Sequence, residues 1–343
     1  MPHRTPVLIA TYLEPEYVDR IAAVDDTVEV RYEPDLLPVP RYRCDHGGTP
    51  RALDETGRRR WEQALADSEV SFDFDWQAPE ALPTRAPRLR WVQATSAGIG
   101  GFVERTGLDR TDLRFTTAAG IHAVPLAEFA LTGALHFVKG LPHLRRQQRD
   151  HRWQRYTTSQ LAGRTVCVVG LGGIGRQVAA TFAALGTRVV GLGRPGRDYG
   201  LDAAVEVRPV DDLDQVLPGT DVLVLCTPLT AQTTGLIGAR QLAALPDGAV
   251  LVNIARGPVV DEPALVEALT SGRLGGACLD VFSTEPLPGD SPLWDLDNVL
   301  VSPHSASTVA TENATLTDLF CDNLRRYLDG RPLRNPYRRE LGY

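Results

Sequence analysis

The chain is poor in several residue types and patterns, and each absence excludes a class of protein. Lys139 is its only lysine, so arginine supplies nearly all of the positive charge. Acidic residues outnumber basic ones, 43 to 36, and a net charge of −7 argues against a nucleic-acid or anionic-membrane partner. No apolar run approaches the roughly 20 residues that span a bilayer, and no apolar segment follows a basic start as in a secretion signal.

Cysteine is scarce and shows no pattern. The five cysteines lie at positions 44, 167, 226, 278 and 321, and no two are spaced as C-x-x-C. An odd, scattered set is typical of reduced thiols in a cytoplasm rather than of disulfides or a zinc site. Cys44, Asp45 and His46 are adjacent, but three neighbouring residues of one loop rarely bind a metal alone. We therefore expect a cytoplasmic protein with no metal.

Short apolar runs that alternate with helical patterns predict an α/β fold with parallel sheets. The expected strands are Val7–Ala10, Val28–Tyr32, Val70–Phe74, Arg90–Ala94 and Leu113–Thr117, then Thr165–Val169, Arg188–Leu192, Val222–Cys226, Val250–Ile254, Ala277–Phe282 and Val299–Val301. The expected helices are Tyr17–Ala23, Val124–Leu144, Arg176–Leu185 and Thr308–Leu328. Between Glu33 and Arg60 the chain is rich in Pro, Gly and Arg, which predicts a long surface loop.

A glycine fingerprint follows the strand expected at Thr165–Val169. Residues 170–175, Gly-Leu-Gly-Gly-Ile-Gly, have the spacing G-x-G-x-x-G. The first glycine permits a tight turn, the second lets the backbone approach a pyrophosphate, and the third allows the helix to pack on the strand. The strand before the glycines and the helix after them predict a Rossmann site for a dinucleotide.

The end of the next strand bears on the choice of cofactor. A site for NAD(H) places Asp or Glu there to bind the ribose hydroxyls. This chain instead has Gly193, followed by Arg194 and Arg197. Gly193 is expected to leave room, and the two guanidinium groups can pair with a 2′-phosphate. The pattern favours NADP(H), with NAD(H) kept as the alternative.

Arg256, Glu285 and His304 each follow an expected buried strand of the second series. Open α/β sheets bind ligands beyond the carboxyl ends of their strands, so we expect the three side chains to lie together. A guanidinium can clamp a carboxylate through two hydrogen bonds, and a carboxylate can favour the protonated form of an imidazole. With the dinucleotide fingerprint, this set predicts hydride transfer to or from a small acid.

Six motifs, in order, resemble the D-isomer-specific 2-hydroxyacid dehydrogenase family, especially its glyoxylate/hydroxypyruvate reductase branch. They are Ser96-Ala97-Gly98, Gly120–Glu128, Gly170–Gly175, Asn253–Gly257, Leu279–Pro286 and Ser302-Pro303-His304. The resemblance implies an α/β fold of two parallel-sheet domains, with a Rossmann dinucleotide-binding domain inserted into a flavodoxin-like substrate domain. We expect residues 120–306 to form the NAD(P)-binding domain, and residues 1–119 and 307–343 to form the substrate domain.

The resemblance also implies roles for the catalytic residues. Arg256 would bind the substrate carboxylate and polarise the keto oxygen. His304 would protonate that oxygen during reduction and accept the proton in the reverse direction, and Glu285 would keep His304 protonated. The backbone amides of Ala97 and Gly98 would bind the carboxylate from the substrate domain.

A longer set of residues would bind the cofactor. Asp280 would orient the nicotinamide carboxamide, and Thr227 and Pro228 would belong to the loop under the cofactor. The complete cofactor-binding set is Gly170, Gly172, Gly173, Ile174, Gly175, Arg194, Arg197, Thr227, Pro228, Ala255 and Asp280.

Two functions from different classes fit these residues. One is an NADP(H)-preferring reductase that converts a small 2-ketoacid, such as glyoxylate or hydroxypyruvate, to the D-2-hydroxyacid. The other is a nucleotide-sensing, corepressor-like interaction protein with little or no turnover, a class that the same family contains. The intact Arg256, Glu285 and His304 favour the enzyme.

Three further features complete the expectations. The segment Val124–Tyr156 resembles the family's exchange arm, which implies a homodimer. The acidic stretch of Asp73, Asp75 and Trp76 departs from the family pattern and is expected to border the substrate. His122, at the start of the expected inter-domain helix, is expected to have a hinge or buried polar role rather than a catalytic one.

Overall fold

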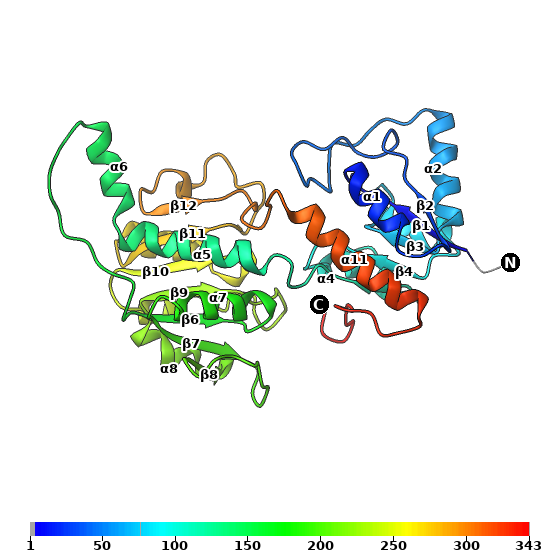
Figure 1. Cartoon of the computed structure of the whole chain (residues 1–343). Helices are drawn as coiled ribbons and strands as arrows, with labels where there is room; N and C mark the ends of the chain where they lie inside the picture. The colour runs from blue at the N-terminus through cyan, green and yellow to red at the C-terminus, as the bar shows by residue number, and fades with distance from the viewer. Residues whose placement is uncertain (1–3, 76, 343) are drawn as a thin grey trace. The chain divides into compact units, whose positions relative to one another are not determined.

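The computed structural model describes residues 4–75 and 77–342, which divide into two compact units. Unit 1 is Met1–His122 with Thr308–Tyr343, and unit 2 is Ala123–Ser307. In Figure 1, unit 1 therefore carries both ends of the colour scale, and unit 2 carries the green-to-orange part. Over the described residues, no helix has the length and apolar character that crossing a membrane requires.

Unit 1 is built on a five-stranded parallel sheet in the order β2-β1-β3-β4-β5. The strands are β1 (Thr5–Ile9), β2 (Val28–Arg31), β3 (Val70–Phe72), β4 (Trp91–Gln93) and β5 (Arg114–Thr116). The helices are α1 (Pro15–Ala22), α2 (Glu55–Asp67), α3 (Leu82–Arg85), α4 (Gly100–Arg105) and α11 (Glu312–Leu328). Because all strands run in parallel, their carboxyl ends lie along one edge of the sheet, where ligands bind in folds of this type.

The C-terminal helix α11 belongs to unit 1. Leu316, Phe320 and Leu324 are fully buried in one hydrophobic cluster with residues of α1 and of the sheet. The Phe320 ring centroid lies 5.0 Å from that of Phe72 and 5.3 Å from that of Trp91. Such aromatic packing buries a large apolar area, so α11 is part of the core of unit 1. The helix begins at Glu312, four residues later than the sequence predicted.

Unit 2 is built on a seven-stranded parallel sheet in the order β12-β11-β10-β9-β6-β7-β8. The strands are β6 (Thr165–Val169), β7 (Arg188–Gly193), β8 (Val205–Pro209), β9 (Val222–Leu225), β10 (Ala249–Asn253), β11 (Leu274–Leu279) and β12 (Val299–Val301). The helices are α5 (Ala123–Val138), α6 (Leu141–Arg149), α7 (Gly173–Ala183), α8 (Leu213–Val216), α9 (Ala239–Ala244) and α10 (Glu262–Thr270). The strand order reverses between β6 and β9, which is where doubly wound sheets bind dinucleotides.

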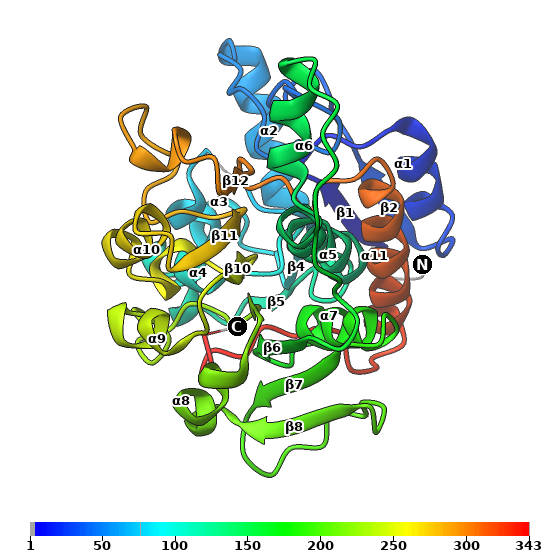
Figure 2. The same cartoon turned by 90° about the vertical axis from the view of Figure 1, so that its left-hand side faces the viewer.

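Both faces of this second sheet are buried. Val166 and Val168 of β6 join a hydrophobic cluster with α5 and α7, whereas Cys167 and Val169 join a cluster with α9 and α10. Figure 2 shows α9 and α10 on one side of the strands and α5 and α7 on the other. Alternate strand residues point to opposite faces, so the continuous apolar runs of the sequence follow from burial on both sides. The prediction of two parallel-sheet α/β domains is confirmed.

Several predicted boundaries were wrong. The helix predicted over Val124–Leu144 is interrupted, because Gly140 adopts a φ of 64° between α5 and α6. The edge strand β8 was missed, although its alternating apolar and polar residues are a strand signal.

The segment Glu33–Arg60 is not only a surface loop. Helix α2 begins at Glu55, where the Asp54 side chain caps the helix by accepting a hydrogen bond from the Gly57 amide at 2.6 Å. Leu36 and Leu37 are buried in the core of unit 1. The prediction of a surface loop was incomplete, because Pro and Gly indicate turns but do not show whether the residues between those turns pack against the core.

Candidate active site

The first and third glycines of the fingerprint permit close backbone packing. Gly170 adopts a φ of 96°, and a Cβ there would lie 2.9 Å from the Thr227 backbone. A Cβ on Gly175 would lie 1.8 Å from the Gly170 carbonyl oxygen. Glycine is therefore required at both positions. The turn requires it at position 170, and the close contact between helix α7 and the end of strand β6 requires it at position 175.

The second glycine leaves open space at the end of a helix. A Cβ on Gly172 would meet no atom within 4 Å. Gly173 begins α7, an 11-residue helix whose amino-terminal N–H groups and dipole favour a negatively charged group. Thr227 lies beside this turn, beyond the carboxyl end of β9, and Pro228 is the next residue of the same loop. The residues present thus fit the pyrophosphate of a dinucleotide.

Beyond β7 the structure corrects the interpretation of Gly193. A Cβ on Gly193 would lie 2.5 Å from the Tyr199 hydroxyl oxygen, so Tyr199 fills the space that the sequence suggested was open. The Tyr199 hydroxyl accepts a hydrogen bond from the Arg194 amide at 2.6 Å. The Arg197 guanidinium lies 5.3 Å from the centre of the Tyr199 ring. Tyr199 therefore shapes the loop that carries the two arginines, a role that the sequence did not predict.

Arg256 follows β10 in a turn that Asn253 stabilises. The Asn253 side chain accepts a hydrogen bond from the Ala255 amide at 3.1 Å and donates one to the Arg256 carbonyl at 3.2 Å. A Cβ on Gly257 would lie 1.9 Å from the Phe282 carbonyl, so the turn packs directly on the loop after β11. The motif Asn253–Gly257 thus positions Arg256 against the loop that carries Glu285.

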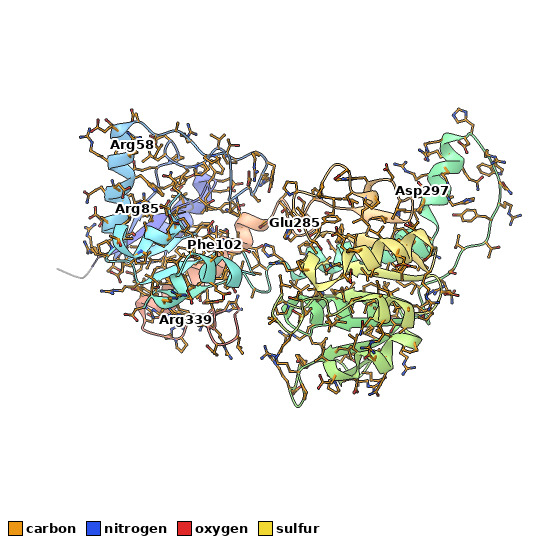
Figure 3. All side chains as sticks on the ribbon, turned by 180° about the vertical axis from the view of Figure 1, so that it is seen from behind. Arg58, Arg85, Phe102, Glu285, Asp297 and Arg339 are labelled. Carbon is orange, nitrogen blue, oxygen red and sulfur yellow. The ribbon has the colours of Figure 1, made fainter. Side chains whose placement is uncertain are left out.

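Glu285 and His304 form a direct pair. The Oε2 atom of Glu285 lies 2.7 Å from Nδ1 of His304, and its Oε1 atom accepts a hydrogen bond from the Phe282 amide at 3.0 Å. Glu285 is labelled in Figure 3, on the loop after β11. His304 adopts a φ of 54°, an unfavourable conformation for a residue with a Cβ. Such strain persists only where surrounding contacts impose it.

Asp280 supplies those contacts. Its Oδ1 atom accepts hydrogen bonds from the Ser302 hydroxyl at 2.6 Å, the Ser305 amide at 2.9 Å and the Ala306 amide at 3.0 Å. Asp280 therefore holds both sides of the turn that carries His304. The sequence predicted only a contact with the cofactor for Asp280, and its role in this turn was missed because the partners lie more than 20 residues away.

Burial and neighbouring charges shift the pKa values of two residues of this site, Arg256 and Asp280. Burial lowers the pKa of the Arg256 guanidinium, and the nearby carboxylates of Glu285 and Asp280 oppose that shift. Arginine keeps its charge in proteins. Burial raises the pKa of the Asp280 carboxyl, while its hydrogen bonds and the neighbouring His304 oppose the shift. Arg256, Glu285, Asp280 and His304 thus form one cluster in unit 2.

The remaining candidates lie in unit 1. Ala97 and Gly98 follow β4 in a partly exposed turn, where the Gly98 amide lies 3.4 Å from the Ser96 hydroxyl oxygen. His122 is buried, and its Nε2 atom lies 3.1 Å from Oε1 of Glu312, so it has the buried polar position that was expected.

The acidic stretch after β3 makes buried contacts within unit 1. Asp75 is buried, forms an ion pair with Arg85 (labelled in Figure 3), and accepts a hydrogen bond from the Trp61 indole at 3.4 Å. Asp75 therefore stabilises the core of unit 1. Asp73 is also buried, and accepts a hydrogen bond from the Thr95 hydroxyl at 3.0 Å. Trp76 lies outside the described residues.

The chain is similar in sequence and fold to known proteins. Residues 131–306 match the family model of the D-isomer specific 2-hydroxyacid dehydrogenase, NAD binding domain. A D-isomer specific 2-hydroxyacid dehydrogenase from Xanthobacter autotrophicus Py2, solved with NADPH and MES, is 32% identical; the similarity covers 99% of this chain and 100% of that chain, with a TM-score of 0.79. The NADPH-dependent glyoxylate/hydroxypyruvate reductase from Sinorhizobium meliloti, solved with NADP and sulfate, is 26% identical, with coverage of 99% and 100% and a TM-score of 0.78.

A third relative differs in length. The D-3-phosphoglycerate dehydrogenase of Mycobacterium tuberculosis strain H37Rv is 35% identical over 339 residues. The similarity covers 94% of this chain but only 57% of that protein. The chain therefore spans a little over half of this curated relative.

Proposed function

Because the chain belongs to the D-isomer specific 2-hydroxyacid dehydrogenase family, we propose that it is an NADP(H)-preferring reductase of a small 2-ketoacid such as glyoxylate or hydroxypyruvate. The product is the D-2-hydroxyacid. The observation that carries this proposal is the cluster of Arg256, Glu285 and His304 in the unit that also holds the glycine fingerprint. Family membership confirms the predicted enzyme class, a nicotinamide-dependent oxidoreductase acting on a CH–OH group.

The proposed mechanism divides the reaction among the three side chains. The nicotinamide cofactor, when bound, supplies the hydride that reduces the keto carbon. Arg256 binds the substrate carboxylate through its planar guanidinium and polarises the keto oxygen. His304 donates a proton to that oxygen from Nε2, since its Nδ1 atom faces the Glu285 carboxylate. Glu285 thereby fixes the orientation of the imidazole ring.

Oxidation of NADPH in the presence of 2-ketoacids tests the function directly. The panel contains glyoxylate, hydroxypyruvate and bulkier 2-ketoacids, and we expect turnover with at least one small member. The chirality of the product is then measured, and the D-isomer is expected. An absence of turnover with the whole panel would contradict the proposal and favour the nucleotide-sensing alternative.

Cofactor preference is expected to depend on Arg194 and Arg197. Charge-assisted hydrogen bonds contribute roughly 1.5–3 kcal/mol each, so replacing both arginines by alanine should lower the NADPH/NADH ratio of kcat/KM by about tenfold or more. An acidic residue at Gly193 is a poor test, because its Cβ would collide with Tyr199.

The matched control is Arg188→Ala at the opposite end of β7, where Arg188 is exposed and pairs with Glu206. This variant should leave the NADPH/NADH ratio unchanged. A higher kcat/KM with NADH than with NADPH in the unmodified protein would contradict the assignment.

A homodimer is the proposed assembly. Four large apolar side chains are exposed in and after α6, and Trp153 is 99% exposed; the four are Leu141, Leu144, Trp153 and Tyr156. Such a set is typical of an interface anchor. Sedimentation at micromolar concentration should show a dimer, and Leu144→Asp should shift it toward the monomer. A monomeric unmodified protein would contradict this proposal.

A cytoplasmic location is also proposed from the cysteines. All five are free thiols, and four are buried. Burial raises the pKa of the Cys167 thiol to about 12, which makes this thiol unreactive near neutral pH. Buried, unreactive thiols are consistent with a reducing compartment.

A further inference from the structure

A polar cluster lies at the carboxyl edge of the unit 1 sheet, outside the catalytic cluster described above. Thr11, Asp73 and Thr95 follow the neighbouring strands β1, β3 and β4, and all three are buried. Their positions follow from the parallel register, in which the Ala10 amide donates to the Phe72 carbonyl. Ala97 and Gly98, the proposed binding site of the substrate carboxylate, continue from the same edge.

His46 reaches this edge from the segment between β2 and α2, which is drawn in blue in Figure 1. Its Nδ1 atom lies 3.1 Å from the Thr11 hydroxyl, and its carbonyl accepts a hydrogen bond from the same hydroxyl at 3.3 Å. Asp45 fixes the turn by accepting hydrogen bonds from the Arg41 amide at 2.9 Å and the Gly48 amide at 3.0 Å. The turn is thus built to hold one imidazole over the end of β1.

The start of α11 closes the other side of the cluster. Cys44 donates a weak hydrogen bond to the Val309 carbonyl at 3.5 Å, which brings the turn against this segment. Glu312 and Asn313 are buried, with exposed fractions of 8% and 1%. Glu312 pairs with His122 through Oε1, and Asn313 donates to Glu14 at 2.8 Å.

Three polar atoms of this cluster have no hydrogen-bond partner within the described part of the chain. They are Nε2 of His46, Oε2 of Glu312 and Oδ1 of Asn313, and all three are closed off from solvent. A buried polar atom left unpaired costs roughly 1–3 kcal/mol, so such atoms point to a ligand group that satisfies them. Burial lowers the pKa of His46, which is opposed by the nearby Asp73 and Glu312 carboxylates. The lowered pKa favours the neutral imidazole, which suits a neutral polar group.

We propose that His46 is a specificity-determining residue that hydrogen-bonds a hydroxyl on the side chain of the 2-ketoacid. The carboxylates of Asp73 and Glu312 make the same place unfavourable for a phosphate or a second carboxylate. This inference rests on the proposed function and restricts its substrate to hydroxylated, unphosphorylated 2-ketoacids.

The test compares kcat/KM with NADPH for three substrates: hydroxypyruvate, pyruvate and 3-phosphohydroxypyruvate. The unmodified enzyme should prefer hydroxypyruvate to each of the others by about tenfold or more, because a site built around a hydrogen bond rejects an analogue that lacks it. His46→Leu should lower the hydroxypyruvate/pyruvate ratio by about tenfold, and His46→Gln should retain most of the preference.

The control variant is Gly47→Ala, in the same turn. A Cβ on Gly47 would meet only Arg41 and Asp45, both at 3.7 Å, so this variant should leave the substrate ratio unchanged. An equal fall with hydroxypyruvate and pyruvate in His46→Leu would show a merely structural role and overturn the inference.

If His46→Leu does not fold, the substrate preference of the unmodified enzyme still tests the inference. Turnover of 3-phosphohydroxypyruvate or pyruvate as fast as hydroxypyruvate would overturn the inference and leave the proposed function intact. An absence of turnover with every 2-ketoacid would overturn both.

Discussion

Replacing His304 by alanine is expected to lower kcat for 2-ketoacid reduction by about 10²- to 10⁴-fold, the usual effect of removing one general acid. The dissociation constant of NADPH should change little, because the fingerprint glycines and the arginines after β7 lie on other loops of unit 2. Stopped-flow measurement of the hydride-transfer step and fluorescence titration with NADPH separate the two effects.

The fold should tolerate this change. His304 is partly exposed, and Asp280 holds its turn through Ser302, Ser305 and Ala306 rather than through the imidazole. The matched control is His151→Ala, since His151 is an exposed histidine of the same unit that also adopts a positive φ, 50°. It should keep full activity. Equal turnover in His304→Ala and the unmodified protein would remove His304 from the mechanism.

The parts of the fold that the sequence predicted correctly depend on local patterns. Strands β6 and β12 were predicted to the residue, because each is a short apolar run between clear turn signals. The fingerprint was equally readable, since the φ of Gly170 and the close approach at Gly175 can be met only by glycine. Such requirements depend on only a few neighbouring residues, so they can be recognised from the local sequence.

The features that the sequence did not reveal depend on partners far along the chain. Tyr199 fills the space beside Gly193, and Asp280 binds a turn more than 20 residues away. The sequence predicted no site at His46, which lies in the segment predicted to be a surface loop. In the structure its imidazole hydrogen-bonds to the Thr11 hydroxyl, 35 residues earlier in the chain. No local rule links such pairs, because the contact exists only once the sheet has formed.

Arg256→Ala is expected to lower kcat/KM for every 2-ketoacid by about 10²- to 10³-fold, since removing one partner of a desolvated charge pair costs roughly 2–5 kcal/mol. The guanidinium is positioned before the substrate binds. Its Nη1 atom donates a hydrogen bond to the Ala255 carbonyl at 2.6 Å, and the Asn253 side chain stabilises the turn by donating one to the Arg256 carbonyl. The loss should appear mainly as a higher KM for the ketoacid, with a further fall in kcat because the keto oxygen is no longer polarised.

Two comparisons distinguish this role from a general effect of charge. Arg256→Lys keeps the charge but not the planar pair of donors, so it should recover only a small part of the activity. Arg240→Ala removes an exposed arginine of the same unit that pairs with Asp214, and it should have no effect. Because all 2-ketoacids share the carboxylate, Arg256→Ala should lower kcat/KM for hydroxypyruvate and pyruvate by the same factor, whereas His46→Leu should change their ratio. Full recovery in Arg256→Lys would show that Arg256 acts only as a positive charge and would contradict the carboxylate clamp.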